Sequence, residues 1–294
     1  MKKISSILLL ILFLVSCSND DNELQVSDVI TGYKITSTTD YDDSSLPDYK
    51  MITTGILVDG KLHSESVEAF VNNVSTGPAI TQQKYFYTSG LLSQVSLGGN
   101  FIDYFYYDNQ NQLIGINRNY SGGQTLNYRF IHQSNNTVYC ERLNLPYNDP
   151  NAEVSQRMIL NFDQNDNVIS AGYDNDLDGV ITNLYNYSYT DNNLTSVQKP
   201  DGTIINYDYS GVIDTRNKLR ELSYGKRVLR MICSENYCSG NSFSLDYSKN
   251  INSNAIISED YEVLPNNYYN KKTRVESLYD PNAQNIEETE FFFE

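Results

Sequence analysis

Three carboxylates stand at alternate positions in Asp174, Asp176 and Asp178, and Gly179 follows them directly. Carboxylate oxygens are the ligands that a hard cation such as Ca²⁺ takes in proteins, and glycine permits the sharp turn that lets several of them converge. Without a cation or water to screen them, these charges would repel one another. The spacing therefore leaves two interpretations open: a solvent-facing turn between two strands, and a structural Ca²⁺ site.

The same stretch resembles the first half of a calcium loop. Tyr185 stands where such a loop carries its bidentate Glu at the twelfth position. Other oxygens, such as the Val180 carbonyl or the Thr182 hydroxyl, would have to complete the shell. An ion bound there would tie the strand before the loop to the strand after it, so its effect would be structural.

Residue patterns typical of enzymes are absent from the sequence. The two histidines, His63 and His132, are far apart and have no ligand-like spacing, so we interpret each as a strand or surface residue. There is no nucleophile elbow, zinc-binding helix motif or glycine-rich phosphate loop. The sequence therefore predicts a non-catalytic protein. A secreted glycan hydrolase that uses a pair of carboxylates is the alternative.

The N-terminus carries the features of an export signal. Lys2 and Lys3 precede an apolar run over 7–15, which is too short to cross a bilayer as a helix and suits a signal peptide. The run ends in Leu14-Val15-Ser16-Cys17, which resembles the lipobox of bacterial lipoproteins. That resemblance implies a signal peptide over 1–16, removed by cleavage, and a lipid on the Cys17 thiol. An ordinary signal peptide with a nearby cysteine is the alternative.

Residues 17–29 are expected to form a flexible tether, because their polar composition cannot bury apolar surface. The run Ser18-Asn19-Asp20-Asp21-Asn22-Glu23 resembles the acidic tag that sends some lipoproteins of Gram-negative bacteria to the cell surface. The resemblance implies an outer-membrane protein, held by its lipid anchor and exposed on the cell surface. A solvated linker on the periplasmic face of that membrane is the alternative.

The net charge of −16 restricts the partners of the chain. Phosphate backbones repel a strongly acidic protein, which argues against nucleic acid as a partner. Anionic lipid head groups repel it as well, so the acyl anchor alone is expected to hold the protein to the membrane.

Three further cysteines fit an exported chain. Cys233 and Cys238 are close enough in sequence to bridge a tight turn, and we expect a disulfide that links a strand over 227–233 to one over 238–247. Cys140 would then remain as a free, buried, small apolar residue.

Aromatic residues recur in a repeated pattern. The chain has 25 Tyr and no Trp, and tyrosine favours strands whereas Asn and Asp favour turns. Segment 105–116 reads aromatic, any residue, aromatic, polar turn, aliphatic, two residues, aliphatic. Counting segment 105–116 itself, copies of the same spacing, shorter copies or looser ones begin at Tyr85, Phe105, Tyr128, Leu160, Tyr187 and Tyr207. Repetition at this scale predicts that each copy is one supersecondary unit.

Each unit is expected to be a β-hairpin. Two aromatics at i and i+2 lie on one face of a strand, and the returning strand places its aliphatics opposite the rings. A hairpin alone is marginally stable, so the copies must pair edge to edge. Further polar turns, such as Ser121-Gly122-Gly123 and Pro200-Asp201-Gly202, link one hairpin to the next.

These units resemble the YD repeat of the Rhs class over about residues 83–219. Tyr107-Asp108 carries the full Tyr-Asp pair and Phe162-Asp163 is a near match, whereas Thr88 and Thr190 stand in the Asp place. Six units are too few to enclose a toxin. The chain looks more like small exported lipoproteins of unknown function that carry a short array of this type, which implies an open or rolled antiparallel sheet.

Strands are also expected outside the array. Val58-Asp59-Gly60-Lys61 marks a hairpin within 32–71, and 275–293 is expected to close the sheet. Only 252–266 leaves room for a short helical turn. The sequence thus predicts one all-β domain over 30–294, an antiparallel meander of repeated hairpins that forms an open or rolled sheet, an incomplete barrel. A transmembrane β-barrel is the alternative.

The function that these features favour is that of a scaffold or binding module. Tyrosine-rich strands are suited to contact a protein or a glycan ligand, although the lack of Trp weakens the case for a glycan. The hydrolase alternative requires a deep pocket that holds two carboxyl groups roughly 5–9.5 Å apart.

Overall fold

The computed structural model describes residues 30–41, 47–191, 193–207, 209–234, 246–248, 256–264, 269–277 and 283–293. The predicted signal peptide, the tether with Cys17, and Cys238 lie outside these residues.

The described strands are β1 (Ile30–Tyr41), β2 (Tyr49–Val58), β3 (Lys61–Val71), β4 (Val74–Ser75), β5 (Ile80–Thr88), β6 (Leu91–Leu97), β7 (Phe101–Tyr107), β8 (Leu113–Tyr120), β9 (Thr125–His132), β10 (Thr137–Leu143), β11 (Val154–Phe162), β12 (Val168–Tyr173), β13 (Tyr185–Thr190), β14 (Asn193–Gln198), β15 (Ile204–Asn206), β16 (Tyr209–Ile213), β17 (Asp246–Ser248), β18 (Ile256–Val263), β19 (Tyr269–Ser277) and β20 (Ala283–Phe293). Two helices, α1 (Thr215–Tyr224) and α2 (Lys226–Ser234), lie between β16 and β17.

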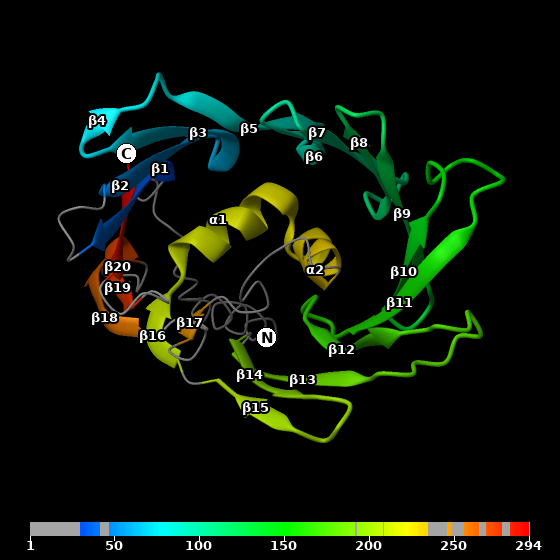
Figure 1. The fold of residues 1–294 in the computed structure, drawn as a ribbon. Helices are drawn as coiled ribbons and strands as arrows, with labels where there is room; N and C mark the ends of the chain where they lie inside the picture. The colour runs from blue at the N-terminus through cyan, green and yellow to red at the C-terminus, as the bar shows by residue number, and fades with distance from the viewer. Residues whose placement is uncertain are drawn as a thin grey trace, which may run out of the picture.

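Within the described residues, 18 strands form one antiparallel sheet, and β16 pairs separately with β17. The spatial order begins β18–β19–β20–β1–β2–β3–β5 and then follows the chain to β15, with β4 paired to the end of β3. Figure 1 shows this sheet curled around the two helices. No pairing between described residues joins β15 to β18. The prediction of an all-β meander in a rolled, incompletely closed sheet is confirmed.

The two ends of the described chain meet in the sheet. β1 pairs with β2 along one edge and with β20 along the other, so that Tyr33 lies between Gly55 and Phe291. The hairpin β19–β20 therefore extends the sheet where the sequence predicted a closing hairpin. The Asp59-Gly60 turn is also confirmed, because both residues adopt positive φ, 51° and 69°, between β2 and β3.

Five of the six predicted repeat units are hairpins. Their aromatic segments lie in the first strands of β5–β6, β7–β8, β9–β10, β11–β12 and β13–β14. The first aromatics, Tyr85 and Phe105, are buried, as are the aliphatics opposite them. The sixth unit differs from the prediction. Tyr207 follows the short strand β15, and Tyr209 begins β16, which pairs with β17.

The repeat contains a β-bulge that its spacing encodes. Leu113 and Ile116 are both buried although they stand three residues apart, whereas residues two apart share a face of a regular strand. A register shift in the β7–β8 ladder leaves Ile114 as an extra residue, which brings both side chains to the same face. The same shift occurs in β5–β6, β11–β12 and β13–β14.

Hairpin β9–β10 lacks the bulge and also lacks the three-residue spacing of buried residues. Its ladder has no register shift, and its buried residues Val138 and Cys140 stand two apart. Because bulges bend strands and increase their twist, their recurrence favours a rolled sheet over a flat one.

The aspartate of the Tyr-Asp pair caps its turn. Asp108 Oδ1 accepts backbone N–H hydrogen bonds from Gln110 and Gln112, both at 2.8 Å, and Asp163 accepts from the corresponding residues of its own turn. Burial opposes the ionisation of Asp163. Hydrogen bonds from the side chain and backbone of Asn167 outweigh that effect and lower its pKa.

The two helices contradict the strand that we predicted over 227–233. These residues lie in α2, and α1 precedes it. The inward side of α1 carries Arg216 and Arg220, which interrupt the apolar periodicity that marks a helix. The short apolar run in α2 is compatible with a strand as well as with a helix. Conversely, 256–263 is strand β18, where a short helical turn was expected.

Both helices lie inside the curve of the sheet and are attached to different parts of it (Figure 1). The Leu62 N–H of β3 donates to Ser223 Oγ of α1 at 3.0 Å. From α2, Arg227 pairs at 2.7 Å with Asp166 in the turn between β11 and β12, and its guanidinium lies over the ring of Phe162. The helices thus connect two distant portions of the sheet.

A buried ion pair joins the two helices to each other. Arg230 of α2 donates to Glu221 of α1 at 2.8 Å, and both side chains are almost fully buried. Burial raises the pKa of Glu221, against the influence of the neighbouring Arg230. The apolar core, which includes Leu219 and Leu229, lies between these helices and the inner face of the sheet.

Candidate functional site

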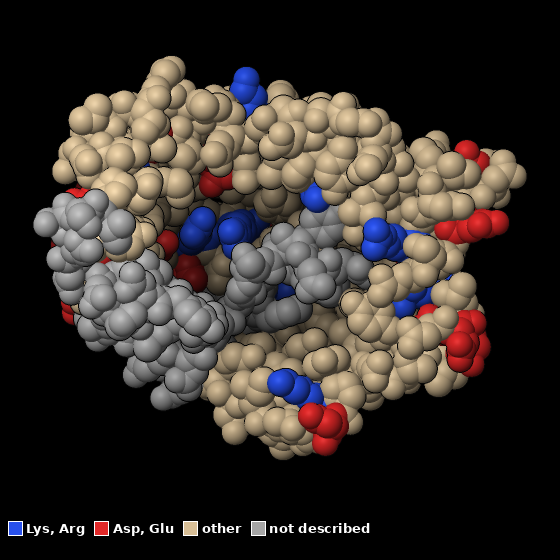
Figure 2. Space-filling model, viewed as in Figure 1, with Lys and Arg blue, Asp and Glu red and all other residues tan. Residues whose placement is uncertain are grey.

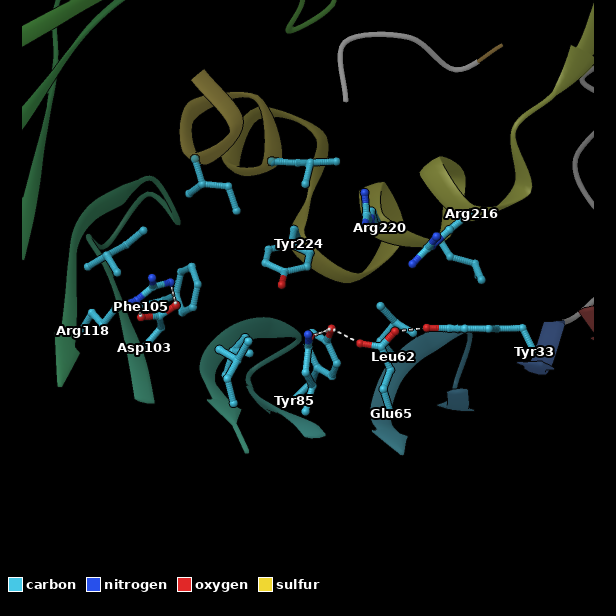
Figure 3. A pocket seen from close by; sticks show the side chains of 17 residues that line it. Tyr33, Leu62, Glu65, Tyr85, Asp103, Phe105, Arg118, Arg216, Arg220 and Tyr224 are labelled. Atoms are coloured by element: carbon cyan, nitrogen blue, oxygen red, sulfur yellow. Dashed lines mark hydrogen bonds and ion pairs between the residues drawn. The ribbon is translucent and has the colours of Figure 1, made fainter. Parts of the chain in front are cut away.

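A polar cavity of about 210 Å³ lies between the helices and the inner face of the sheet. Figure 3 shows its side chains converging from α1 and from the strands below it. Its polar lining consists of Tyr33, Glu65, Gln83, Tyr85, Asp103, Arg118, Arg216, Arg220 and Tyr224. This volume is that of several water molecules, which suits a small ligand.

Helix α1 supplies a polar stripe to the cavity. Arg216, Arg220 and Tyr224 follow one another at four-residue intervals, so they share one side of the helix. Asp214 caps the helix by accepting N–H hydrogen bonds from Arg216 and Asn217. This cap and the contact of Ser223 with β3 fix the rotation of the helix, and they turn the two arginines toward the sheet.

Glu65 on β3 faces that stripe and is held by two tyrosines. Its Oε1 accepts a hydrogen bond from Tyr33, and its Oε2 accepts one from Tyr85 at 2.8 Å. The Tyr85 hydroxyl also lies 2.5 Å from Gln83 Oε1. Burial, reinforced by the charge of Glu65, raises the pKa of both tyrosines, so they remain protonated donors at neutral pH.

The second carboxylate of the cavity is fully engaged. Both oxygens of Asp103 accept hydrogen bonds from Arg118, at 2.6 and 2.7 Å, in a bidentate pair. The Arg118 guanidinium also stacks over the ring of Phe101, 3.8 Å from its centroid. Burial raises the pKa of Asp103, although Arg118 acts in the opposite direction.

Arg216 and Arg220 differ from Arg118 in their surroundings. Among the residues that the structure describes, neither guanidinium has a hydrogen bond or an ion pair. Burial disfavours the charge of Arg216, but Tyr33, Glu287 and Glu65 nearby raise its pKa. Both arginines are therefore charged and have hydrogen-bond donors to spare.

The cavity is positive in an otherwise acidic protein. Three arginines and two carboxylates line it, which leaves a net charge of +1 against −16 for the chain. Figure 2 shows blue groups inside the hollow that the sheet encloses, with red groups beside them. A low-dielectric cavity of this sign attracts an anion.

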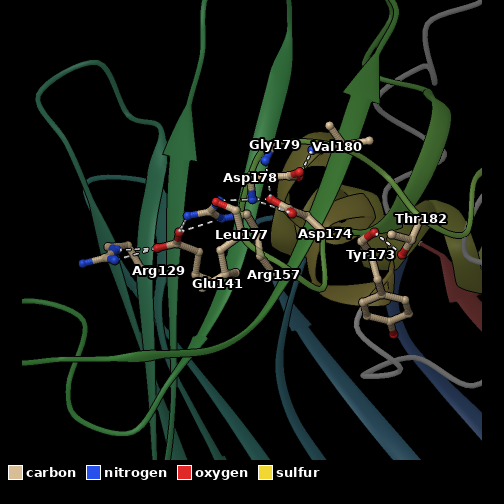
Figure 4. A network of polar contacts seen from close by, with 10 residues as sticks. All are labelled: Arg129, Glu141, Arg157, Tyr173, Asp174, Leu177, Asp178, Gly179, Val180 and Thr182. Atoms are coloured by element: carbon tan, nitrogen blue, oxygen red, sulfur yellow. Dashed lines mark hydrogen bonds and ion pairs between the residues drawn. The ribbon is translucent and has the colours of Figure 1, made fainter.

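The predicted calcium loop lies on the outer face of the sheet and belongs to a different network (Figure 4). Arg129, Glu141 and Arg157 alternate in sign across β9, β10 and β11, and Asp174 continues the row at 3.0 Å from Arg157. Asp174 also accepts the backbone N–H groups of residues 178 and 179. Burial opposes its ionisation, but the hydrogen bonds from Arg157 and Gly179 lower its pKa.

The structure does not bring the three predicted calcium ligands together. Asp174 is buried against Arg157, Asp178 accepts the N–H of Val180 at 2.8 Å, and Asp176 is exposed. Within the described residues, no group of three acidic, histidine or cysteine side chains is placed to hold a metal. Ca²⁺ would have to displace Arg157 from Asp174, and its binding stays a prediction.

The two histidines and Cys140, which the sequence analysis named, lie outside the cavity lining. Cys140 forms no disulfide with a described residue and is fully buried, as predicted. His63 is exposed on β3, and His132, at the end of β9, contacts the Leu113 carbonyl at 2.8 Å. The backbone of Cys233 is at the end of α2, but its side chain and Cys238 lie outside the described residues, so their disulfide stays a prediction.

Sequence reasoning missed the cavity because its residues come from eight separate elements. One signal was available: Asp214 precedes Thr215, and Gly225 follows Tyr224, which is the pattern of a capped ten-residue helix. Within that helix the four-residue spacing of Arg216 and Arg220 would have marked a charged face. No helix in the described part of the chain has the length and apolar character needed to cross a membrane.

Comparison with known proteins gives weak similarities. No family model matches the chain, and no curated protein matches it in sequence. A porin-like protein from Bacteroides uniformis is 8% identical, with 91% of this chain and 98% of that chain covered and a TM-score of 0.40. The Tc holotoxin pore of Photorhabdus luminescens is 11% identical, with 81% of this chain and 14% of that chain covered and a TM-score of 0.29. A DUF1329 family protein from Desulfovibrio piger is 8% identical, with 60% of this chain and 82% of that chain covered and a TM-score of 0.17. These similarities are too weak to indicate a function.

Proposed function

We propose that this chain is an exported, lipid-anchored binding protein without catalytic activity, and that the cavity under α1 is its ligand site. The observation that carries the proposal is the pair Arg216 and Arg220. These two charged donors face a cavity in the interior of the sheet, and no described residue pairs with them. Both side chains are partly buried, and withdrawing unpaired charge from water is costly, so a site of this kind is best explained by a ligand that completes it.

The anchor follows from the sequence. Cys17 takes the lipid, and residues 18–29 separate it from β1. An extended segment of that length reaches roughly 40 Å. The domain can therefore stand clear of the outer membrane on the cell surface.

Binding explains the cavity better than glycan hydrolysis does. A hydrolase needs one carboxyl group that donates a proton and a second that acts as nucleophile or base. Here both oxygens of Asp103 are bound to Arg118, and both oxygens of Glu65 accept from tyrosines. These contacts hold the two groups as fixed acceptors.

A thermal-shift screen of small metabolites on the detergent-solubilised protein tests the binding proposal. The variant Leu97→Phe adds volume at a residue that lines the cavity, and Leu145→Phe adds the same bulk at an exposed position elsewhere. We expect at least one compound that raises the Tm of the wild type and of Leu145→Phe, but not of Leu97→Phe. If no compound shows this pattern, the cavity is not a binding site.

Protease treatment of intact cells tests the location. A surface-exposed domain is degraded while periplasmic marker proteins stay intact. Full protection of the domain, with digestion after the outer membrane is permeabilised, would place it on the periplasmic face instead.

A further inference from the structure

The cavity carries two kinds of binding group, which narrows its ligand. Arg216 and Arg220 offer charge-assisted donors on one side. Glu65 offers a carboxylate acceptor opposite them, on β3 (Figure 3). Like charges four residues apart on a helix are destabilising, so two adjacent guanidinium groups without a described partner fit a site for an anionic group. The planar fork of arginine matches the geometry of a carboxylate.

Glu65 indicates that the ligand also carries hydrogen-bond donors. Each of its oxygens accepts one tyrosine hydroxyl, and a carboxylate oxygen can accept a second hydrogen bond. Tyr33 and Tyr85 hold the carboxylate in one orientation, so its free acceptor positions are fixed. A ligand hydroxyl placed there completes its hydrogen bonding.

The net positive charge of the cavity lining disfavours an ammonium group as the donor to Glu65. Arg216 acts electrostatically on Tyr33 and is itself influenced by Glu65, and Arg220 acts on both Tyr33 and Tyr224. A cation at Glu65 would therefore lie in the field of both arginines, whereas a neutral hydroxyl would not be repelled. The tyrosine rings add amphipathic walls that suit a hydroxylated carbon chain or ring.

Resting on the proposed function, we propose that the ligand is a small hydroxylated monocarboxylate, such as a sugar acid. Its carboxylate is bound by Arg216 and Arg220 of α1, and its hydroxyl groups donate to Glu65. The size of the cavity, about 210 Å³, limits the ligand to about one monosaccharide unit.

Calorimetric titration of the solubilised full-length lipoprotein with matched pairs tests the charge requirement. The pairs are glucuronate and glucose, gluconate and glucitol, and glycerate and glycerol. We expect at least one acid to bind at least tenfold more tightly than its neutral partner. If every neutral compound binds as well as its acid, or if no acid binds, the inference fails. Tighter binding of serine than of glycerate would fail it too, because it would show that an ammonium group is preferred.

Variants of α1 assign the contact. Arg220→Gln is expected to weaken binding of the acid at least tenfold and to leave the affinity of the neutral partner unchanged. Lys218→Gln, on the same helix but outside the cavity lining, removes the same charge and should bind normally. Arg220→Lys keeps the charge but loses the fork, so an intermediate affinity is expected. Equal affinities for Arg220→Gln and Lys218→Gln would overturn the assignment, once unfolding curves show that both variants are folded.

The experiments distinguish failure of the anionic ligand from failure of the binding site. A neutral compound that binds in the wild type and is blocked by Leu97→Phe leaves the cavity as a binding site and removes only the anionic ligand. Failure of the entire metabolite screen removes the site itself.

Discussion

The ring of Tyr33 on β1 lies across Gly55, its register partner on β2, so closely that a Cβ at residue 55 would stand 2.2 Å from the ring. The aromatic side chain occupies the space that a neighbouring side chain would otherwise fill. From this position its hydroxyl reaches Glu65 in the cavity. A residue without a side chain on β2 thus permits a contact in the candidate site.

Gly55→Ala is therefore expected to destabilise the protein by about 1–3 kcal/mol, the range for overpacking of a well-packed site. Tyr33 would have to move and lose its hydrogen bond to Glu65. Urea unfolding monitored by tyrosine fluorescence measures the change. Gly77→Ala is the matched control, because a Cβ there meets no atom within 4 Å. Equal stability of the two variants would contradict the close contact.

Asp174→Asn is expected to cost about 2–3 kcal/mol at pH 7, because it removes one of the two negative partners of Arg157 and weakens acceptance from two backbone N–H groups. The folded-state pKa of Asp174 is lowered, so its contribution is fully present above the unfolded pKa of about 3.9. It is lost as the pH falls through the folded pKa. The gap in unfolding free energy between wild type and variant should stay constant from pH 7 to 5 and shrink below about pH 4. A constant gap down to pH 2.5 would contradict this linkage.

Calcium binding by Asp174, Asp176 and Asp178 makes a separate prediction. If the ion binds, millimolar Ca²⁺ should raise the Tm relative to EGTA, and Asp176→Ala should abolish the difference without the large loss of stability expected for Asp174→Asn. Extracellular sites with Kd of about 10⁻⁴–10⁻³ M would respond in this range. Identical melting curves in both buffers would leave the loop as a turn held by Arg157.

The lipid anchor is tested by Cys17→Ala. The variant should leave the membrane fraction and keep the wild-type unfolding curve, because the polar segment that carries residue 17 has little apolar surface to bury. Cell fractionation followed by immunoblotting measures the distribution. Wild-type levels of the variant in the membrane fraction would exclude Cys17 as the anchor.

A disulfide between Cys233 and Cys238 predicts that neither thiol reacts with maleimide in the unreduced, denatured protein and that both react after reduction. Cys140 serves as the internal control, because it forms no disulfide with any described residue. In the mass spectrum of the unreduced Cys17→Ala variant, one added maleimide is expected, and three would rule the disulfide out.

The sheet was largely predictable from the sequence, because the information that specifies it is local. Paired aromatics, turn residues and spaced aliphatics lie within about twelve residues of one another in each hairpin, as in 105–116. The three-residue spacing of Leu113 and Ile116 also encodes the bulge, but the spacing alone does not distinguish a bulge from a longer turn. The strand order around β1 was not predictable, because it depends on pairing between remote segments.

The candidate site could not be predicted, for a related physical reason. Glu65, Asp103 and Arg216 look like surface residues in a one-dimensional pattern, since charge is normally solvated. Only the placement of α1 inside the roll makes them neighbours. A helix with arginines on its inward side contradicts the usual apolar stripe, and departures of this kind are expected where a site is built.

The pairing of β1 with β20 constrains the order in which the molecule can be completed. Thr31 and Phe292, which share a hydrogen bond across that ladder, are 261 residues apart in the chain. During synthesis β1 can pair with β2 early, but its other edge lacks β20 until residues 283–293 have been made. An open strand edge is a template for association with other chains, and closing so long a loop is slow. A cell that makes this protein therefore has to keep one edge of a nearly finished sheet from aggregating until β20 is available.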